Sequence, residues 1–285
     1  MIIVTGANGP FGRLVAERLL DLVPAGEVAV SVRAPDAAGA LRERGVAVRH
    51  GDFGRPGTLP GAFRDAATVL VNGTYYGAAP EVRGPQLQGA VAAAVAAGAR
   101  RVVVTSWPDA GRSTLAATAD FAGTERAVRA LPVAWTIVRA GHGLPAALAR
   151  DVLAARRDGV LTAPAGRARL AVARTADLAE ATARVLAGGD GHGGRTYELT
   201  GPDAIGWDEL AELAGPGIAY RPEAEDEFRA RWVAAGWPPP VAEQLLALYA
   251  CIRTGWAGTP THDLETLLGR RPAGARAAVA EAAGG

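Results

Sequence analysis

Three glycines near the amino terminus have the spacing that a bound pyrophosphate requires. Gly6, Gly9 and Gly12 form a G-x-x-G-x-x-G motif directly after the short apolar run at residues 2–4. In a dinucleotide-binding unit the first glycine permits a tight turn, the second lets backbone approach the phosphates, and the third lets helix and strand pack closely. The spacing also fits a purely structural turn. Its place between a strand and a helix favours the nucleotide interpretation.

The other residues of this turn are assigned to the same site. Amide groups at a helix N-terminus bind phosphate oxygens, helped by the partial positive charge of the helix dipole. Pro10 has no amide hydrogen, so Phe11 and Gly12 must supply these donors. Asn8 lies within the same turn and is predicted to contact the cofactor.

Arg33 is the predicted selector between NADP and NAD. It ends the second expected strand, residues 27–33, about 20 residues after Gly12, where the adenosine ribose lies in this fold. A carboxylate there binds the 2′-hydroxyl of NAD, whereas an arginine suits the 2′-phosphate of NADP. Since no carboxylate lies between the end of this strand and Asp36, we predict NADP(H). The alternative is a solvated arginine at a strand end.

Further cofactor contacts are expected where the third and fourth strands end. Asp52 follows residues 46–49 and could accept a bond from the adenine amino group, with Phe53 beside the ring. The alternative for Asp52 is a turn that caps the next helix. The segment Asn72, Gly73 and Thr74 follows the fourth strand and should pass beneath the cofactor.

Few side chains could donate a proton to a substrate beside the nicotinamide. The catalytic candidates follow the fourth, fifth and sixth strands, and they are Tyr75, Ser106 and His142. Ser106 is also a cofactor candidate. The predicted substrate contacts are Tyr76, Trp107, His142 and Trp232. The structural alternatives are a lid or packing aromatic for each tyrosine, packing between helices for Trp232, and a turn hydroxyl for Ser106. His142 lies between two glycines, which suggests an exposed loop.

A doubly wound parallel sheet is the fold that would gather these residues. Apolar strands alternate with helical segments, and the six strands are expected at residues 2–4, 27–33, 46–49, 68–71, 101–105 and 133–138. Loops at the carboxyl ends of such strands build the site. We predict a Rossmann-type cofactor domain over residues 1–142. A smaller, mostly helical substrate domain over 143–285 is partly interleaved with it, and its tail from 277 is expected to be frayed or a loose helix.

The composition excludes several other classes of protein. The chain has 285 residues, 49% of them apolar, and a formal net charge of +1, so no nucleic-acid partner is expected. It has one cysteine and four scattered histidines, which argues against a disulfide or a metal site. No apolar run reaches the roughly 18 residues of a membrane span, and the first strand leaves no room for a signal peptide. A cytoplasmic location is expected.

Several segments together resemble the NmrA-like branch of the atypical short-chain dehydrogenases/reductases, especially its NAD(P)H:quinone oxidoreductase members. They are residues 5–12, 32–33, 51–53, 102–106, 124–125, 135–139, 196–202 and 263–270, so the resemblance spans nearly the whole chain. It implies a Rossmann domain, a small carboxyl-terminal substrate domain and NADP(H). The family also includes members that bind the dinucleotide as redox sensors and do not catalyse a reaction.

The usual catalytic pair of the wider superfamily is absent. That pair is Tyr-x-x-x-Lys, in which the lysine lowers the pKa of the tyrosine phenol. All 30 basic residues here are arginine. In related NmrA-like reductases a lysine follows a phenylalanine by three residues, but here Thr124 stands three after Phe121.

We therefore predict hydride transfer from NADPH to a quinone-like or conjugated carbonyl compound, which needs little acid assistance. Two alternatives stay open: a non-catalytic NADP(H) sensor, and an isomerase or cyclase on the same fold. The oligomeric state is also open, with a homodimer as one option.

Overall fold

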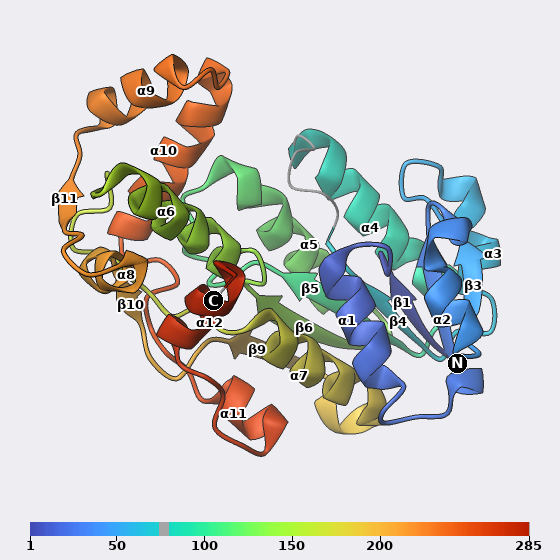
Figure 1. Ribbon diagram of the computed structural model, residues 1–285. Helices are drawn as coiled ribbons and strands as arrows, with labels where there is room; N and C mark the ends of the chain where they lie inside the picture. The colour runs from blue at the N-terminus through green and yellow to red at the C-terminus, as the bar shows by residue number, and fades with distance from the viewer. Residues whose placement is uncertain (74–79, 285) are drawn as a thin grey trace.

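The apolar strands assemble into one parallel sheet in the computed structural model, which describes residues 1–73 and 80–284 (Figure 1). Its strands are β1 (Ile2–Thr5), β2 (Val28–Val32), β3 (Ala47–His50), β4 (Thr68–Val71), β5 (Arg101–Ser106), β6 (Ala134–Ala140) and β9 (Arg195–Leu199). Their spatial order is β3-β2-β1-β4-β5-β6-β9, and every pairing is parallel. The predicted doubly wound sheet is confirmed. The order reverses between β1 and β4, and ligands bind at such a switch point.

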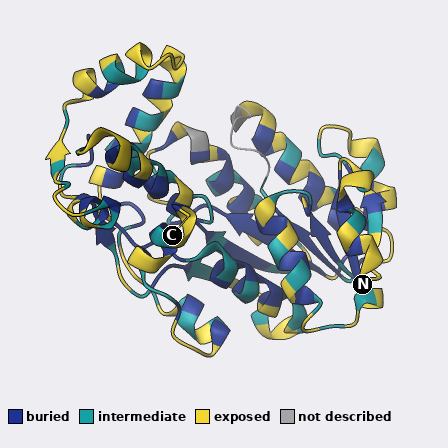
Figure 2. Ribbon diagram, viewed as in Figure 1, coloured by how far each residue is buried: buried dark blue, intermediate teal, exposed yellow. Residues whose placement is uncertain are grey.

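The sheet is buried on both faces because alternate residues of each strand enter two separate cores. Ile3, Val69 and Val102 belong to one cluster, whereas the next residues along the same strands, Val4, Leu70 and Val103, belong to the other. This is the period of two that a pleated strand imposes. Figure 2 shows the strands as a dark, buried layer with exposed residues on the outer faces of the helices.

Two groups of helices cover the two faces. Helices α1 (Pro10–Leu19) and α7 (Thr175–Ala187) pack side by side on one face. On the other lie α3 (Leu59–Phe63), α4 (Pro80–Ala96) and α5 (Ala119–Arg129). The short helix α2 (Gly39–Glu43) precedes β3.

The carboxyl-terminal half forms a mostly helical lobe that follows β6. Its helices are α6 (Leu144–Asp158), α8 (Trp207–Ala214), α9 (Glu225–Ala234), α10 (Pro239–Arg253), α11 (Asp263–Leu268) and α12 (Ala275–Ala282). Two small sheets pair β7 (Leu161–Ala163) with β11 (Tyr220–Pro222), and β8 (Arg169–Leu170) with β10 (Ile205–Gly206). Among the described helices, none is both long and apolar enough to cross a membrane.

Two expectations from the sequence need correction. The sheet has a seventh strand, because β9 returns after α7 and pairs with β6, so the chain re-enters the first unit well beyond residue 142. The domain boundary at residue 142 stays a prediction. The two predicted domains are interleaved more extensively than the strand pattern suggested. The tail is a packed helix, since Ala278 and Val279 of α12 are buried against α6 and α8.

Candidate functional site

The glycine turn lies between β1 and α1 and leaves backbone open toward solvent. Gly6 has a φ of +70°, a conformation that glycine adopts without steric cost. A Cβ atom on Gly12 would lie 2.5 Å from the carbonyl oxygen of Gly6, so only a glycine lets the helix approach this closely. A Cβ on Gly9 would meet only that same oxygen, at 3.4 Å. Gly9 therefore has room on its outer side, where a phosphate would approach.

The first turn of α1 suits an anion. Pro10 stands at its start, and no acidic residue lies in this turn. The amide groups at the start of a helix have no partner within it, and the helix dipole adds partial positive charge. The turn thus fits the pyrophosphate of a dinucleotide, with the amides of Phe11 and Gly12 as donors.

Asn8 ties this turn to the end of β2. Its Nδ2 donates to the carbonyl oxygen of Ala34 at 2.8 Å. Arg33, the residue before Ala34, is exposed and makes no ion pair with the residues that the structure describes. The guanidinium of Arg33 is therefore free to bind an added anion beside the turn.

The floor of the site is a chain of polar contacts across β1, β4 and β5. The amide of Asn72 donates to the hydroxyl oxygen of Thr5 at 2.9 Å, and the hydroxyl of Thr105 donates to Asn72 Oδ1 at 2.9 Å. The amide of Gly73 donates to Thr105 Oγ1 at 2.7 Å. These bonds fix the backbone after β4 close to Gly6. Thr74, Tyr75 and Tyr76, which follow directly, lie outside the described residues.

Asp52 forms a local turn. Its Oδ1 accepts a bond from the amide of Gly54 at 2.9 Å, and its own amide donates to the hydroxyl of Thr58 at 2.9 Å. This favours the turn alternative, although the second carboxylate oxygen lies only near Arg55, at 4.0 Å. Phe53 is partly buried against the core. Contacts of Asp52 and Phe53 with adenine stay a prediction.

His142 is a packed residue, so the expected exposed loop is wrong. Its ring stacks on Phe11, with ring centres 4.5 Å apart and an angle of 19° between planes. Nδ1 donates to the carbonyl oxygen of Ala140 at 3.3 Å. Burial lowers the pKa of His142, and this hydrogen bond offsets the effect only in part. His142 is therefore a neutral imidazole near neutral pH and a weak proton donor. The hydroxyl of Thr175 donates to the carbonyl oxygen of His142 at 3.1 Å, which links α7 to this segment.

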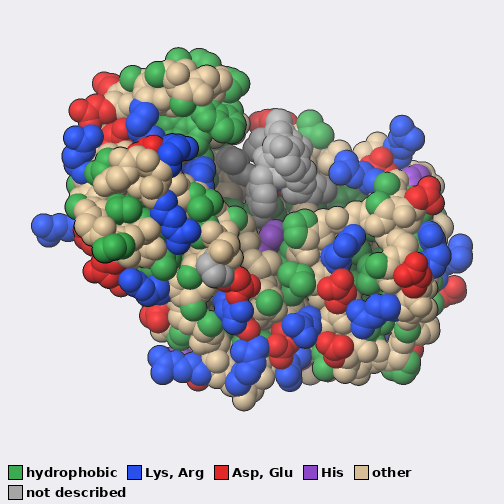
Figure 3. All heavy atoms as spheres, viewed as in Figure 1, with side chains coloured by type: hydrophobic (Ala, Val, Ile, Leu, Met, Phe, Trp, Pro, Cys, Tyr) green, Lys and Arg blue, Asp and Glu red, His purple; other side chains and the backbone are tan. Residues whose placement is uncertain are grey.

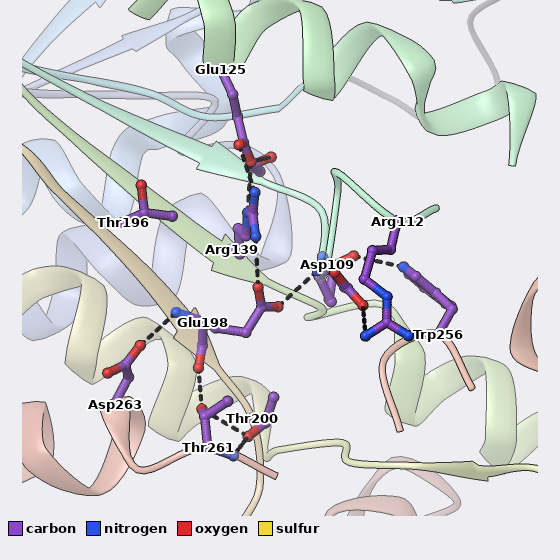
Figure 4. A network of polar contacts seen from close by, with 12 residues as sticks. Asp109, Arg112, Glu125, Arg139, Thr196, Glu198, Thr200, Trp256, Thr261 and Asp263 are labelled. Atoms are coloured by element: carbon purple, nitrogen blue, oxygen red, sulfur yellow. Dashed lines mark hydrogen bonds and ion pairs between the residues drawn. The ribbon is translucent and has the colours of Figure 1, made fainter. Parts of the chain in front are cut away.

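Ser106 is committed to a buried ion network. Its hydroxyl is 3% exposed and donates to Glu125 Oε1 at 2.6 Å. Arg139 donates to both oxygens of Glu125 at 2.8 Å and to Glu198 at 3.1 Å (Figure 4). Burial raises the pKa of Glu125, but the bonds from Arg139 and Ser106 outweigh it and hold the pKa below its usual value. With its proton engaged by a carboxylate, Ser106 positions the end of β5 in this structure, and its role as proton donor stays a prediction.

Glu198 extends the network to the loop after β5. Its Oε1 accepts the amide of Asp109 at 2.8 Å, and Asp109 has the unfavourable φ of +46°. Burial raises the pKa of Glu198 above its usual value, because its effect is larger than that of the bonds from Asp109 and Arg139, which lower the pKa. The indole of Trp256 donates to the carbonyl oxygen of Pro108 at 2.7 Å. The loop 106–109 is thus held from both sides beside the predicted nicotinamide position (Figure 4).

The two tryptophans predicted at the substrate lie in aromatic packing clusters. Trp107 is 8% exposed and stacks on Trp256, with ring centres 5.8 Å apart. Trp232 on α9 packs against Trp237, with ring centres 5.4 Å apart, and the guanidinium of Arg150 lies over the Trp232 ring. This favours the packing alternative for Trp232 and shows that Trp107 is also a packed aromatic, and the contact of both with a substrate stays a prediction. On the α9–α10 hairpin, hydrophobic side chains gather at the surface, and Trp237 is 51% exposed (Figure 3).

Sequence reasoning did not identify Glu125, Glu198 or Thr105 as site residues. Glu125 lies on the buried face of α5, Thr105 is buried in the apolar strand β5, and Glu198 is half-buried in β9. A charged residue at a buried position is the available signal, because buried charges are nearly always paired.

A family model described as NAD(P)H-binding matches residues 6–187 of the chain. Quinone oxidoreductase 2 of Escherichia coli is 33% identical over 252 residues, which cover 86% of this chain and 85% of that protein. The (4-alkanoyl-5-oxo-2,5-dihydrofuran-3-yl)methyl phosphate reductase of Streptomyces griseus is 33% identical over 285 residues, covering 95% and 93%. Among solved structures, Citrobacter sp. triphenylmethane reductase complexed with NADP(H) matches with a TM-score of 0.91 and 30% identity, covering 99% of this chain and all of that one, 100%.

Proposed function

This chain belongs to the NAD(P)H-binding family, in the NmrA-like branch of the atypical short-chain dehydrogenases/reductases, and is an oxidoreductase; we propose that it transfers hydride from NADPH to a quinone-like or conjugated carbonyl compound. The observation that carries the proposal is the open glycine turn at the switch point of the sheet, beside the fixed loop 106–109. The names of the relatives support an electron-poor acceptor, since they act on a quinone, an unsaturated lactone and a triphenylmethane dye.

The residues present fit the dinucleotide. Gly9, Phe11 and Gly12 would bind the pyrophosphate, Arg33 the 2′-phosphate, and Asn72 with Gly73 would support the nicotinamide half. Bound NADPH supplies the hydride. The protein would hold the cofactor and the acceptor within reacting distance, roughly 3–3.5 Å, in a space that loop 106–109 and His142 would border.

The described residues are weak proton donors, so the protein should favour acceptors that need little acid assistance. The chain has no lysine to activate a tyrosine. His142 is neutral, and the proton of Ser106 is engaged by Glu125. Water must then supply the proton after hydride transfer. This is sufficient for a quinone or an enone, whose reduced anion is delocalised, and insufficient for a simple ketone.

The proposal is tested by mixing the NADPH-loaded protein with a panel of quinones, enones and simple ketones and following nicotinamide absorbance. We expect NADPH consumption with quinones and enones and little or none with simple ketones. Fast reduction of simple ketones would contradict the mechanism. Inertness across the panel, with tight NADPH binding intact, would favour a dinucleotide sensor or a non-redox isomerase.

We expect Arg33 to select NADPH over NADH by about 1–3 kcal/mol, the range for a charge-assisted contact. Arg33→Ala should remove most of this preference and leave NADH affinity unchanged. The matched control is Arg44→Ala, which removes an equally exposed charge just before β3, at the opposite end of the strands. Titration of both cofactors against the three proteins measures the effect. Equal affinities in the wild type would refute Arg33 as the selector.

A further inference from the structure

A second cavity lies in the carboxyl-terminal lobe, away from the glycine turn. It has a volume of about 520 Å³ and is lined by two segments. One is the turn between β7 and β8, residues 165–169, and the other is the end of α10 with the loop that follows, residues 252–259. The volume is within the range of small-molecule sites, roughly 300–1,000 Å³.

The lining of this cavity is cationic. It contains three arginines, Arg167, Arg169 and Arg253, and no carboxylate. Arg169 pairs with Glu209 at 2.7 Å and Arg253 with Glu225 at 2.5 Å, so the charge of each is already balanced from outside the lining. Arg167 is exposed and forms no ion pair with any residue in the described parts of the chain. One positive charge in the cavity is thus left unbalanced.

The rest of the wall is mainly backbone and small side chains. Gly166 and Gly255 have φ values of +59° and +84°, and a Cβ on Gly258 would lie 2.9 Å from the carbonyl oxygen of Arg169. Glycine is therefore required at these positions, and its absent side chains leave the cavity open beside the guanidinium groups. Thr259 adds a hydroxyl group to the lining.

We propose that this cavity binds a small anion, a phosphate or carboxylate group, with the guanidinium of Arg167 as its main contact. A planar guanidinium pairs with such groups through two parallel, charge-assisted hydrogen bonds. Arg169 and Arg253 are held at the wall of the cavity by their own carboxylate partners, Glu209 and Glu225, so Arg167 supplies the unbalanced charge. The anion is either free in solution or a substituent of the acceptor that the proposed reduction uses, and only the second case rests on the proposed function.

The lining of the cavity is connected to the loop after β5, which borders the proposed reaction site. Gly255 and Gly258 flank Trp256, which is 1% exposed and whose indole donates to the carbonyl oxygen of Pro108 (Figure 4). One buried side chain thus separates the lining of the cavity from the loop after β5.

Calorimetric titration of the NADPH-saturated protein with inorganic phosphate, at constant ionic strength, tests the site directly. Saturation with NADPH keeps phosphate out of the dinucleotide site. We expect binding that Arg167→Ala weakens about tenfold. Arg271→Ala should leave it unchanged, since it removes another exposed arginine, in the loop after α11, that forms no ion pair with the residues described by the structure. Both positions are exposed, so neither variant threatens folding.

Kinetics distinguish the two sources of the anion. The same variants are assayed with a neutral quinone and with a quinone that carries a phosphate or carboxylate group. A KM for the charged quinone that Arg167→Ala alone raises about tenfold, with kcat unchanged, identifies the substrate as the source. Phosphate binding without this KM effect identifies a free anion. The proposal is overturned by absence of both effects, or by equal effects of the two variants, whereas NADPH binding and turnover of the neutral quinone report on the proposed function alone.

Discussion

Gly9→Val will abolish dinucleotide binding while the protein stays folded. Gly9 has φ −81° and ψ 157°, an extended conformation that valine readily adopts, and its Cβ would meet protein only at 3.4 Å. The two methyl groups would project toward the outer side of the turn, where the pyrophosphate must contact backbone amides. NADPH titration should show no saturable binding, and circular dichroism should match the wild type.

Two further glycine variants show whether this effect is local. Gly12→Ala forces a Cβ to within 2.5 Å of a backbone oxygen, so it should lower thermal stability as well as binding. Gly26→Val lies at the other end of the strands, where a Cβ meets nothing within 4 Å, and should change neither property. Retained NADPH binding in Gly9→Val would show that the cofactor lies elsewhere.

Arg139→Leu will destabilise the protein by about 3 kcal/mol at neutral pH, near the lower end for a broken buried pair. It leaves the carboxylates of Glu125 and Glu198 without their shared cation, and the Glu125 side chain is only 3% exposed. Arg129→Leu is the matched control. It removes another ion pair to Glu125, but the Arg129 side chain is 38% exposed, so a loss below about 1 kcal/mol is expected. Urea unfolding of the three proteins measures both values.

The pH dependence identifies the cause of the loss. In the wild type the pKa of Glu125 is held below its usual value. The contribution of ionised Glu125 to the free energy of unfolding is therefore present at pH above the usual carboxyl pKa and is lost as the pH falls below that pKa. In Arg139→Leu burial acts without the main opposing contact, and the pKa should rise above the usual value. As pH falls from neutral toward about 5, protonation of Glu125 removes the unpaired buried charge in the variant. The difference in free energy of unfolding between the variant and the wild type then becomes smaller. A difference in free energy of unfolding that does not depend on pH would indicate that the variant loses packing and not that it contains an unpaired charge.

The sequence predicted the parts of the site that depend on local pattern. The glycine turn between β1 and α1, the free Arg33 and the parallel order of β1 to β6 all follow from short-range periodicity and spacing. The NAD(P)H-binding character is confirmed by the family match, and the oxidoreductase class is confirmed by the similar reductases.

Long-range partners were not predictable from the chain itself. Ser106 is engaged by Glu125 of α5, and Arg139 of β6 joins Glu125 to Glu198 of β9. Only the pairing of β5, β6 and β9 and the packing of α5 bring these residues together. The same limit explains the tail. Alanine favours a helix, but a helix this short is marginal on its own, so α12 is fixed by burial of Val279 against α6 and α8.

Isotope labelling shows whether hydride passes directly from NADPH to a conjugated acceptor. NADPH deuterated at nicotinamide C4 is incubated with the protein and an enone, and the product is analysed by mass spectrometry. We predict one deuterium on the β-carbon of the product, with the second hydrogen taken from solvent, as a parallel reaction in deuterated water would show. An unlabelled product, or an enone that stays unreduced while NADPH binds tightly, would contradict the account.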